Sequence, residues 1–385
     1  MELNYGPEHD TFREQVRAFL RSEWREGTNV AAFRRAAVEA GYLYRGIPRR
    51  FGGSEQPSDV IRARIISEEF AAAKAPGEIK GNGVQMLVPT LLERGEEWQK
   101  ERFIAKTLTG EYRWAQGFSE PGSGSDLASL RTKAELRDGQ WVINGQKVWT
   151  SYARECQYMF ALIRTEPQAG KHDGISYLLI DLDQPGVDIR PMKQINGGND
   201  FNEVFFTDAV TPADWIVGAR GEGWSVSKSL LKHERNMLGG IDRSESLFKS
   251  VVGLARRCEL RGQAALLDPW VRDRLAALKA ELEVQRCSSL IQMSRELSGE
   301  GGGMLQMMNK LAQSNFAAAV AELANALIED DALVSPIGNP RPGSERWVNQ
   351  YMNSLAAAIA GGTSNIQRNI IAERGLGLPR ESHQE

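Results

Sequence analysis

The chain has 385 residues, which is too long for one simple core and predicts two or three domains. Its net charge of −3 excludes the strongly basic surface of a nucleic-acid-binding protein. Cys156, Cys258 and Cys287 lack the C-x-x-C spacing of a zinc site, and no apolar run reaches the roughly 20 residues of a membrane span. We therefore expect a cytoplasmic protein without a metal site.

Residues 1–113 are predicted to form a helical domain. In "HDTFREQVRAFLRSE" the apolar residues recur at helical spacing, and Thr11 with Glu14 has the spacing of a capping box. The runs "SDVIRARIISEEFAAA" and "VQMLVPTLLERG" continue the helical pattern, with glycine and proline between them.

Residues 114–220 are predicted to form a β-domain, a small barrel or sandwich. The stretch "TKAELRDGQWVINGQKVWTS" alternates apolar and polar residues, with "RDGQ" and "INGQ" as turn signals. Helical periodicity returns in residues 221–385, notably in "DPWVRDRLAALKAELEVQRCSSLIQMSREL" and "GGGMLQMMNKLAQSNFAAAVAELANALI". We expect an α+β fold that ends in a C-terminal helical bundle.

Three motifs occur in a fixed order along the chain. They are "FSEPGSGSD" at 118–126, "INGQKVWTS" at 143–151 and "GGTSNIQRNIIAERGLG" at 361–377. Together they resemble the flavin segment, the following strand pair and the C-terminal signature of the acyl-CoA dehydrogenase family. The chain is most similar to the large, flavin-contacting subunit of heteromeric steroid-side-chain acyl-CoA dehydrogenases. The resemblance implies FAD as cofactor and the family's helical, β and helical domains.

The residue types in these motifs suit a flavin, which has apolar ring faces and hydrogen-bonding edges. Glycines permit close backbone approach, Ser119 offers a hydroxyl, and Trp149 offers a broad apolar surface. Taken alone, "EPGSGSD" would more often be a surface loop and Trp149 a core residue. The resemblance implies that FAD is bound by Phe118, Ser119, Gly124, Ser125, Trp149, Ser151, Thr363 and Asn365, and substrate by Ser125 and Arg235.

One expected catalytic group is missing from the last motif. The family's reaction removes the α-hydrogen of an acyl thioester as a proton and the β-hydrogen as a hydride to flavin N5, so it needs a base. Most members carry a glutamate directly before "GT", where this chain has Ala360 and Gly361. A minority place the base on the helix after the β-domain, which here carries Glu234 and Arg235 in "SLLKHERNMLGG".

Glu234 is therefore expected to be the base; the alternative is a solvated carboxylate on a charged helix face. The Gly361 N–H is expected to donate to the thioester carbonyl. The small side chains at 360 and 361 predict a wide pocket, suited to a bulky or branched acyl group such as a steroid side chain.

Two strings with which a neighbouring subunit of typical members binds the FAD pyrophosphate, Arg-x-x-Phe-Gly and Gln-x-x-Gly-Gly-x-Gly, do not occur in this sequence. The resemblance then implies a second, unlike acyl-CoA dehydrogenase-like subunit in an α2β2 heterotetramer. A homo-oligomer in which Arg257 or Arg261 substitutes is the alternative. Electrons are expected to pass to an electron-transferring flavoprotein. A flavin oxidase or monooxygenase of the same fold and a non-catalytic subunit of a mixed complex are the competing functions.

Overall fold

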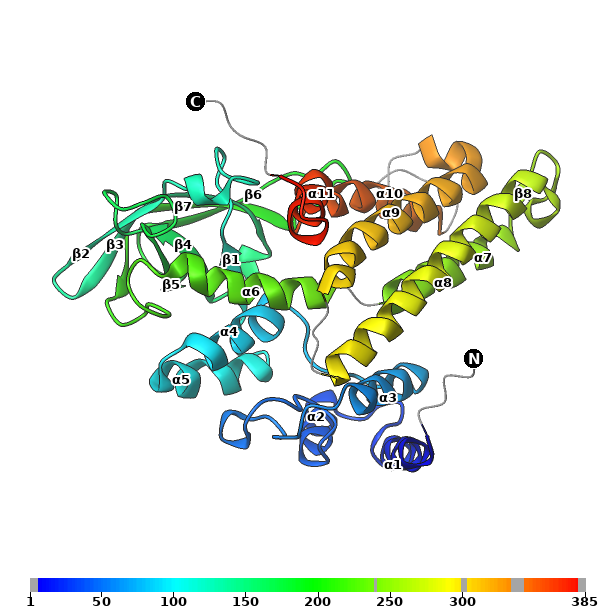
Figure 1. Ribbon diagram of the computed structural model, residues 1–385, viewed down its shortest axis with the longest axis horizontal. Helices are drawn as coiled ribbons and strands as arrows, with labels where there is room; N and C mark the ends of the chain where they lie inside the picture. The colour runs from blue at the N-terminus through cyan, green and yellow to red at the C-terminus, as the bar shows by residue number, and fades with distance from the viewer. Residues whose placement is uncertain (1–5, 239–240, 299–302, 334–342, 380–385) are drawn as a thin grey trace. The chain divides into compact units, whose positions relative to one another are not determined.

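The computed structural model describes residues 6–238, 241–298, 303–333 and 343–379 (Figure 1). The chain divides into two compact units. The first comprises residues 1–123, 127–190 and 202–230, and the second residues 124–126, 191–201 and 231–385. Helical regions precede and follow a β-sheet along the chain, which confirms the α+β class. The division into three domains at 113 and 220 stays a prediction.

The helices of the first unit are α1 (Pro7–Glu23), α2 (Val30–Glu39), α3 (Val60–Ala72), α4 (Val88–Arg94), α5 (Glu97–Leu108) and the start of α6 (Gly223–Leu238). Among the described helices, none is long and apolar enough to cross a membrane. The side chains of Asn29 and Asp59 cap α2 and α3 by accepting hydrogen bonds from the amides of Ala32 and Arg62.

Helix α1 begins earlier than its capping-box pattern predicts. Pro7 occupies the first turn, where its fixed φ suits a helix and its missing N–H leaves no donor unpaired. Thr11 therefore lies one turn inside the helix, and its hydroxyl donates to the Pro7 carbonyl at 3.2 Å. The capping box at Thr11 and Glu14 is thus wrong, although the apolar stripe is confirmed by buried Phe12, Val16 and Leu20.

Helices α1 and α3 are joined by an ion cluster around the buried Glu69. Its carboxylate accepts hydrogen bonds from Arg13 Nη1 at 2.6 Å and from Arg17 Nε at 2.8 Å. The neighbouring Glu68 also pairs with Arg13, at 2.8 Å, but its side chain is one-third exposed. Buried charges cost more to leave unpaired than exposed ones, so Glu69 carries more of this contact.

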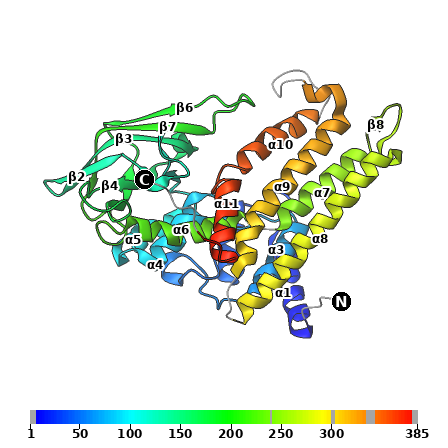
Figure 2. The same cartoon turned by 45° about the horizontal axis from the view of Figure 1, so that its top comes forward.

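The β-strands of the first unit form one curled seven-stranded sheet (Figure 2). They are β1 (Trp114–Gly117), β2 (Lys133–Arg137), β3 (Gln140–Ser151), β4 (Tyr158–Arg164), β5 (Ile175–Asp181), β6 (Val187–Pro191) and β7 (Phe201–Pro212). The order is β1-β4-β2-β3-β7-β6, with β5 paired to β4. β1 and β4 run parallel, whereas β2 and β3 form an antiparallel hairpin.

One of the two predicted turns lies where expected. Asp138 and Gly139 join β2 to β3 with φ values of 48° and 77°, as a two-residue hairpin requires. The predicted turn at "INGQ" is wrong, because β3 runs through it. Gly145 is needed there for packing: a Cβ on it would lie 2.7 Å from Thr132 Cα and 2.6 Å from Thr132 Oγ1.

The second unit is a helical bundle, as predicted. It contains α7 (Ile241–Ala255), α8 (Pro269–Leu297), α9 (Gly303–Ile328), α10 (Ser344–Ala357) and α11 (Ser364–Ile370). Figures 1 and 2 both show α7, α8 and α9 side by side. A short hairpin, β8 (Glu259–Leu260) and β9 (Gln263–Ala264), joins α7 to α8. Val251, Phe316 and Val320 are fully buried in the core of the helical bundle.

Glu69→Gln should lower the free energy of unfolding of the full chain by about 2 kcal/mol, because it removes the charge that two arginines share in a buried site. Glu68→Gln is the matched control and should cost less than about 1 kcal/mol, since its carboxylate is partly solvated. Urea denaturation followed by circular dichroism measures both. Equal losses for the two variants would contradict the burial argument.

Candidate functional site

The segment after β1 carries the first group of predicted flavin residues. The Phe118 side chain is only 6% exposed and packs edge-to-face against Phe160 and Tyr177, with ring centroids 6.1 and 6.3 Å away. The Phe118 ring is thus part of the core of the domain. Ser119 is half-buried, and its N–H makes no hydrogen bond to another described residue.

The end of β3 lies beside this segment, since the Val148 N–H donates to the Ser119 carbonyl at 2.9 Å. Trp149 is 59% exposed, and its φ of +60° is rare for so bulky a residue. The next residue, Thr150, is fully buried, and its Oγ1 has no hydrogen-bond partner among the described residues. Exposed apolar area, an unsatisfied hydroxyl and a strained backbone in consecutive positions are typical of a binding site.

From inside the domain, the Lys147 side chain connects the loop after β1 to strand β4. Its side chain is 0% exposed, and Nζ lies 2.7 Å from Glu120 Oε1, 2.7 Å from the Leu162 carbonyl and 3.2 Å from the Phe118 carbonyl. One ammonium group therefore holds the loop after β1 to the neighbouring strand β4. Glu120 in turn accepts from the amides of Arg131 at 2.6 Å and Thr132 at 3.0 Å.

Burial and pairing move the pKa values of both groups. Burial lowers the pKa of Lys147 to about 8, because its charged form loses water that the Glu120 carboxylate only partly replaces. Burial alone would raise the pKa of Glu120. The Lys147 ammonium and the two amide donors outweigh that effect, so the pKa of Glu120 falls below its ordinary value. The contact of 2.7 Å between Lys147 Nζ and Glu120 Oε1 stabilises the charged form of each group.

The glycines of "FSEPGSGSD" are exposed rather than packed. A Cβ placed on Gly122 or Gly124 would meet no atom within 4 Å, so packing within the described chain does not explain why these residues are glycine. Residues 124–126 belong to the second compact unit, and Ser125 is exposed there. The turn itself is closed by paired backbone hydrogen bonds between Glu120 and Ser123, at 2.9 and 3.0 Å.

The turn that begins the C-terminal motif is built on two glycines with left-handed backbone. Gly361 has a φ of +65° and Gly362 a φ of +93°. The Gly362 carbonyl accepts from the buried Lys310 Nζ at 2.7 Å, and Gln367 Nε2 lies 3.4 Å from the Gly361 carbonyl. These carbonyl contacts fix the turn, and Thr363 then caps α11 by accepting from the Ile366 N–H at 3.2 Å.

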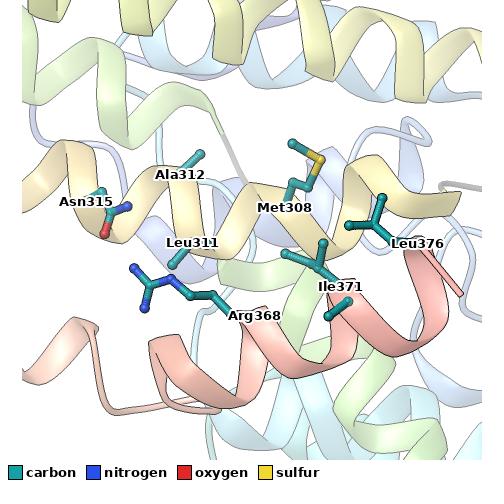
Figure 3. Close-up of a pocket in the computed structure, with 8 residues that line it drawn as sticks. Met308, Leu311, Ala312, Asn315, Arg368, Ile371 and Leu376 are labelled. Atoms are coloured by element: carbon teal, nitrogen blue, oxygen red, sulfur yellow. The ribbon is translucent and has the colours of Figure 1, made fainter. Parts of the chain in front are cut away.

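Asn365 begins the exposed face of α11, and its Oδ1 accepts from Arg368 Nη1 at 3.1 Å. Arg368 also lines a cavity of about 400 Å³ between α9 and α11, with Asn315 beside it at the same end (Figure 3). The rest of the lining is apolar: Met308, Leu311, Ala312, Ile371, Ala372 and Leu376. None of the residues predicted from the sequence lines this cavity, which only the folded helices assemble.

Glu234 and Arg235 belong to α6, which extends from Gly223 to Leu238. Their side chains lie outside the described residues. The helical position expected for the base is thus present, whereas its catalytic role stays a prediction.

Two residues of the site were missed by sequence reasoning although both lie inside the recognised motifs. Lys147 has the same strand parity as Trp141 and Ile143, which are 2% and 0% exposed. Alternation along a strand therefore points the Lys147 side chain into the core, where a lysine needs an acceptor. Glu120, the only carboxylate of "FSEPGSGSD" that precedes the glycines, is that acceptor.

Comparison with known proteins covers nearly the whole chain. Residues 6–111 match the N-terminal domain model of acyl-CoA dehydrogenase, residues 115–209 its middle domain and residues 221–376 its C-terminal domain. Acyl-CoA dehydrogenase IpdE1 of Mycobacterium tuberculosis is 41% identical over 98% of this chain and 91% of its own. Acyl-CoA dehydrogenase FadE29 of the same organism is 31% identical over 99% of both chains.

Solved structures give the same result. The ChsE4-ChsE5 complex from Mycobacterium tuberculosis contains a chain that superposes with a TM-score of 0.80 at 26% identity, covering 99% of this chain and 100% of that one. The steroid ACAD Tcur3481-Tcur3483 has a TM-score of 0.79 at 25% identity, covering 99% and 100%. The chain is therefore a member of the acyl-CoA dehydrogenase family, an oxidoreductase that acts on acyl-CoA.

Proposed function

We propose that this protein uses FAD to introduce an α,β double bond into a bulky acyl-CoA thioester, with Glu234 as the base. The observation that carries the proposal is the end of β3, where Trp149 is 59% exposed and has a left-handed backbone, in a chain that matches all three family models. Such a surface fits the face of an aromatic cofactor.

The residues present fit the ring end of FAD. In the first unit, Trp149 would pack against the isoalloxazine while Ser151 and the backbone of Phe118 and Ser119 offer hydrogen bonds. In the second unit, Gly124, Ser125, Thr363 and Asn365 are the assigned contacts. Because Asn365 Oδ1 accepts a hydrogen bond from Arg368, the side-chain NH₂ of Asn365 is the group that would donate to the cofactor. When bound, FAD supplies the acceptor for the hydride that leaves the β-carbon.

The chain must then hold the thioester and take one proton. Each turnover removes a proton from the α-carbon and a hydride from the β-carbon, and leaves a carbon–carbon double bond. Gly361 has no side chain to act as base, but its N–H can donate to the thioester carbonyl and stabilise the charge that develops there. We assign Glu234 on α6 as the base that accepts the α-proton. The adjacent Arg235 is assigned to bind the substrate.

Glu234→Gln should lower kcat by about 10²- to 10⁴-fold, because the amide keeps the shape of the side chain but cannot accept the α-proton. FAD content should stay unchanged. Glu281→Gln, at an exposed position of α8, is the matched control and should keep full activity. Steady-state assay of the assembled enzyme measures both variants. A Glu234→Gln enzyme with wild-type kcat would remove Glu234 from the mechanism.

The acyl group is proposed to be a steroid side chain or a similarly bulky one. Ala360 and Gly361 present little side-chain volume where most family members carry a glutamate. The similarity to the steroid ACAD Tcur3481-Tcur3483 supports this choice. A straight chain would fill such a pocket poorly and would gain less from apolar burial.

The kcat/KM for a steroid-side-chain CoA thioester should exceed that for octanoyl-CoA by at least about tenfold, because the two differ only in the part that contacts the pocket. Ala360→Leu should reduce turnover of the bulky substrate more than that of octanoyl-CoA. Steady-state turnover of each thioester measures kcat/KM, and anaerobic loss of the flavin's visible absorbance shows whether the thioester reduces the flavin. Preference for octanoyl-CoA would refute the bulky pocket, and no bleaching by any thioester would favour an oxygen-using flavoenzyme.

A second, unlike subunit is proposed to complete the FAD site. The two pyrophosphate-binding strings are missing from the sequence. The β8–β9 hairpin lies between α7 and α8. Arg261 lies in the turn of this hairpin, is exposed, and its Nη1 lies 3.7 Å from Asp268 Oδ2. The ChsE4-ChsE5 complex joins two differently named chains, which supports a heteromeric assembly.

The chain expressed alone should purify with clearly less than one FAD per protein, because two phosphate charges would lack donors from a partner. Flavin absorbance relative to protein measures occupancy, and a family member with both strings controls for loss during purification. Full occupancy and activity without a partner would contradict the heteromer. Arg257→Gln and Arg261→Gln would then identify the substitute arginine.

A further inference from the structure

Lys147 occupies a position where a charged side chain has no access to water. The side chain is 0% exposed, and the three acceptors around Nζ come from two segments besides its own strand β3: the Phe118 carbonyl and Glu120 carboxylate of the loop after β1, and the Leu162 carbonyl of β4. An ammonium group has three donors, so every donor is used. Among the described residues, Glu120 supplies the negative charge within hydrogen-bond distance of Nζ.

Glu120 extends this contact to a fourth segment. Its two carboxylate oxygens accept from consecutive backbone amides, those of Arg131 and Thr132, just before β2. Thr132 is 1% exposed, and its hydroxyl donates to the Gln146 carbonyl at 3.2 Å. The loop after β1, the start of β2 and the end of β3 are thus fixed to one another through buried polar groups.

The contact also sets the direction of one peptide group. The Phe118 carbonyl accepts from Lys147 and therefore points into the domain. In a trans peptide the N–H of the next residue points the opposite way, so the Ser119 N–H points away from Lys147. That N–H makes no hydrogen bond to another described residue, whereas the Ser119 carbonyl is held by Val148 N–H next to Trp149.

We propose that Lys147 and Glu120 are positioning residues for the cofactor: they orient the Ser119 N–H outward, polarise its peptide, and fix it beside Trp149. The inference rests on the proposed FAD function. It assigns no contact between either side chain and the cofactor, since both are buried on the far side of the Phe118–Ser119 peptide. An ammonium bound to the carbonyl draws electron density from the amide and strengthens its N–H as a donor.

Stability alone does not explain this pair. Replacing both members of a buried ion pair by neutral groups of similar size is often neutral or stabilising, whereas removing one member leaves an uncompensated charge. A pair kept only for folding could thus be replaced by apolar residues. Its contact with the carbonyl of the Phe118–Ser119 peptide gives it a second role, which can be separated from stability.

Three variants of the full chain test the role, in the assembled enzyme where FAD binding needs the partner: Lys147→Met, Glu120→Gln and the double variant. Each single variant should lose stability and FAD affinity. The double variant should regain most of the stability, because no buried charge is left unpaired, but its FAD dissociation constant should stay at least tenfold above the wild-type value. Hydrogen exchange of the Ser119 amide in the apo protein should be at least tenfold slower in the double variant, because its peptide is then neither polarised by an ammonium group nor held outward.

Glu69→Gln is the matched control, since it disturbs another buried ion cluster in the same unit and should leave FAD affinity and the flavin spectrum unchanged. A double variant with wild-type FAD affinity, spectrum and Ser119 exchange would overturn the positioning role alone. A wild-type enzyme that binds no FAD with any partner would overturn the proposed function itself, and the flavin role of the pair with it.

Discussion

A buried ammonium group holds the first half of the site together. Lys147 Nζ joins the loop after β1 to β4 and, through Glu120, to the start of β2. Three segments that are distant in sequence depend on this one charge being balanced, because a buried ion without its partner is far more costly than a missing neutral hydrogen bond. The surface that carries Ser119 and Trp149 is thus built on an electrostatic contact beneath it rather than on apolar packing alone.

This support has a physical reason, since the segment above it is strained. Trp149 and Tyr152 both have left-handed backbone, with φ of 60° and 53°, and each such residue costs about 1–2 kcal/mol. Both aromatic side chains are also more than half exposed. Strain and exposed apolar area persist only where surrounding structure enforces them. The strands β4 and β5, which are buried except at their last residues, and the Lys147 contact supply that rigidity next to the site.

Sequence patterns predicted the elements better than the contacts between them. Long periodic helices such as α8 and α9, and the "RDGQ" hairpin, followed directly from local spacing. The "INGQ" turn failed because Gly145 serves close packing against Thr132, a tertiary reason that the same letters do not reveal. Strand parity could have placed Lys147 inside the sheet, but its acceptors come from elsewhere in the chain. The cavity beside Arg368 likewise exists only once α9 and α11 pack together.

The backbone of the turn at Gly361 explains why a glutamate at this position would require more than a change of side chain. Gly361 and Gly362 both use left-handed backbone, which any other residue adopts only with strain, and their carbonyls contact Gln367 and Lys310. These carbonyl contacts hold the backbone of the turn in place. Under the proposed assignment, the proton is left to Glu234 on α6, a regular helix that tolerates a glutamate without backbone cost. Separating the two roles lets the turn stay small beside the acyl group while the base keeps an unstrained position.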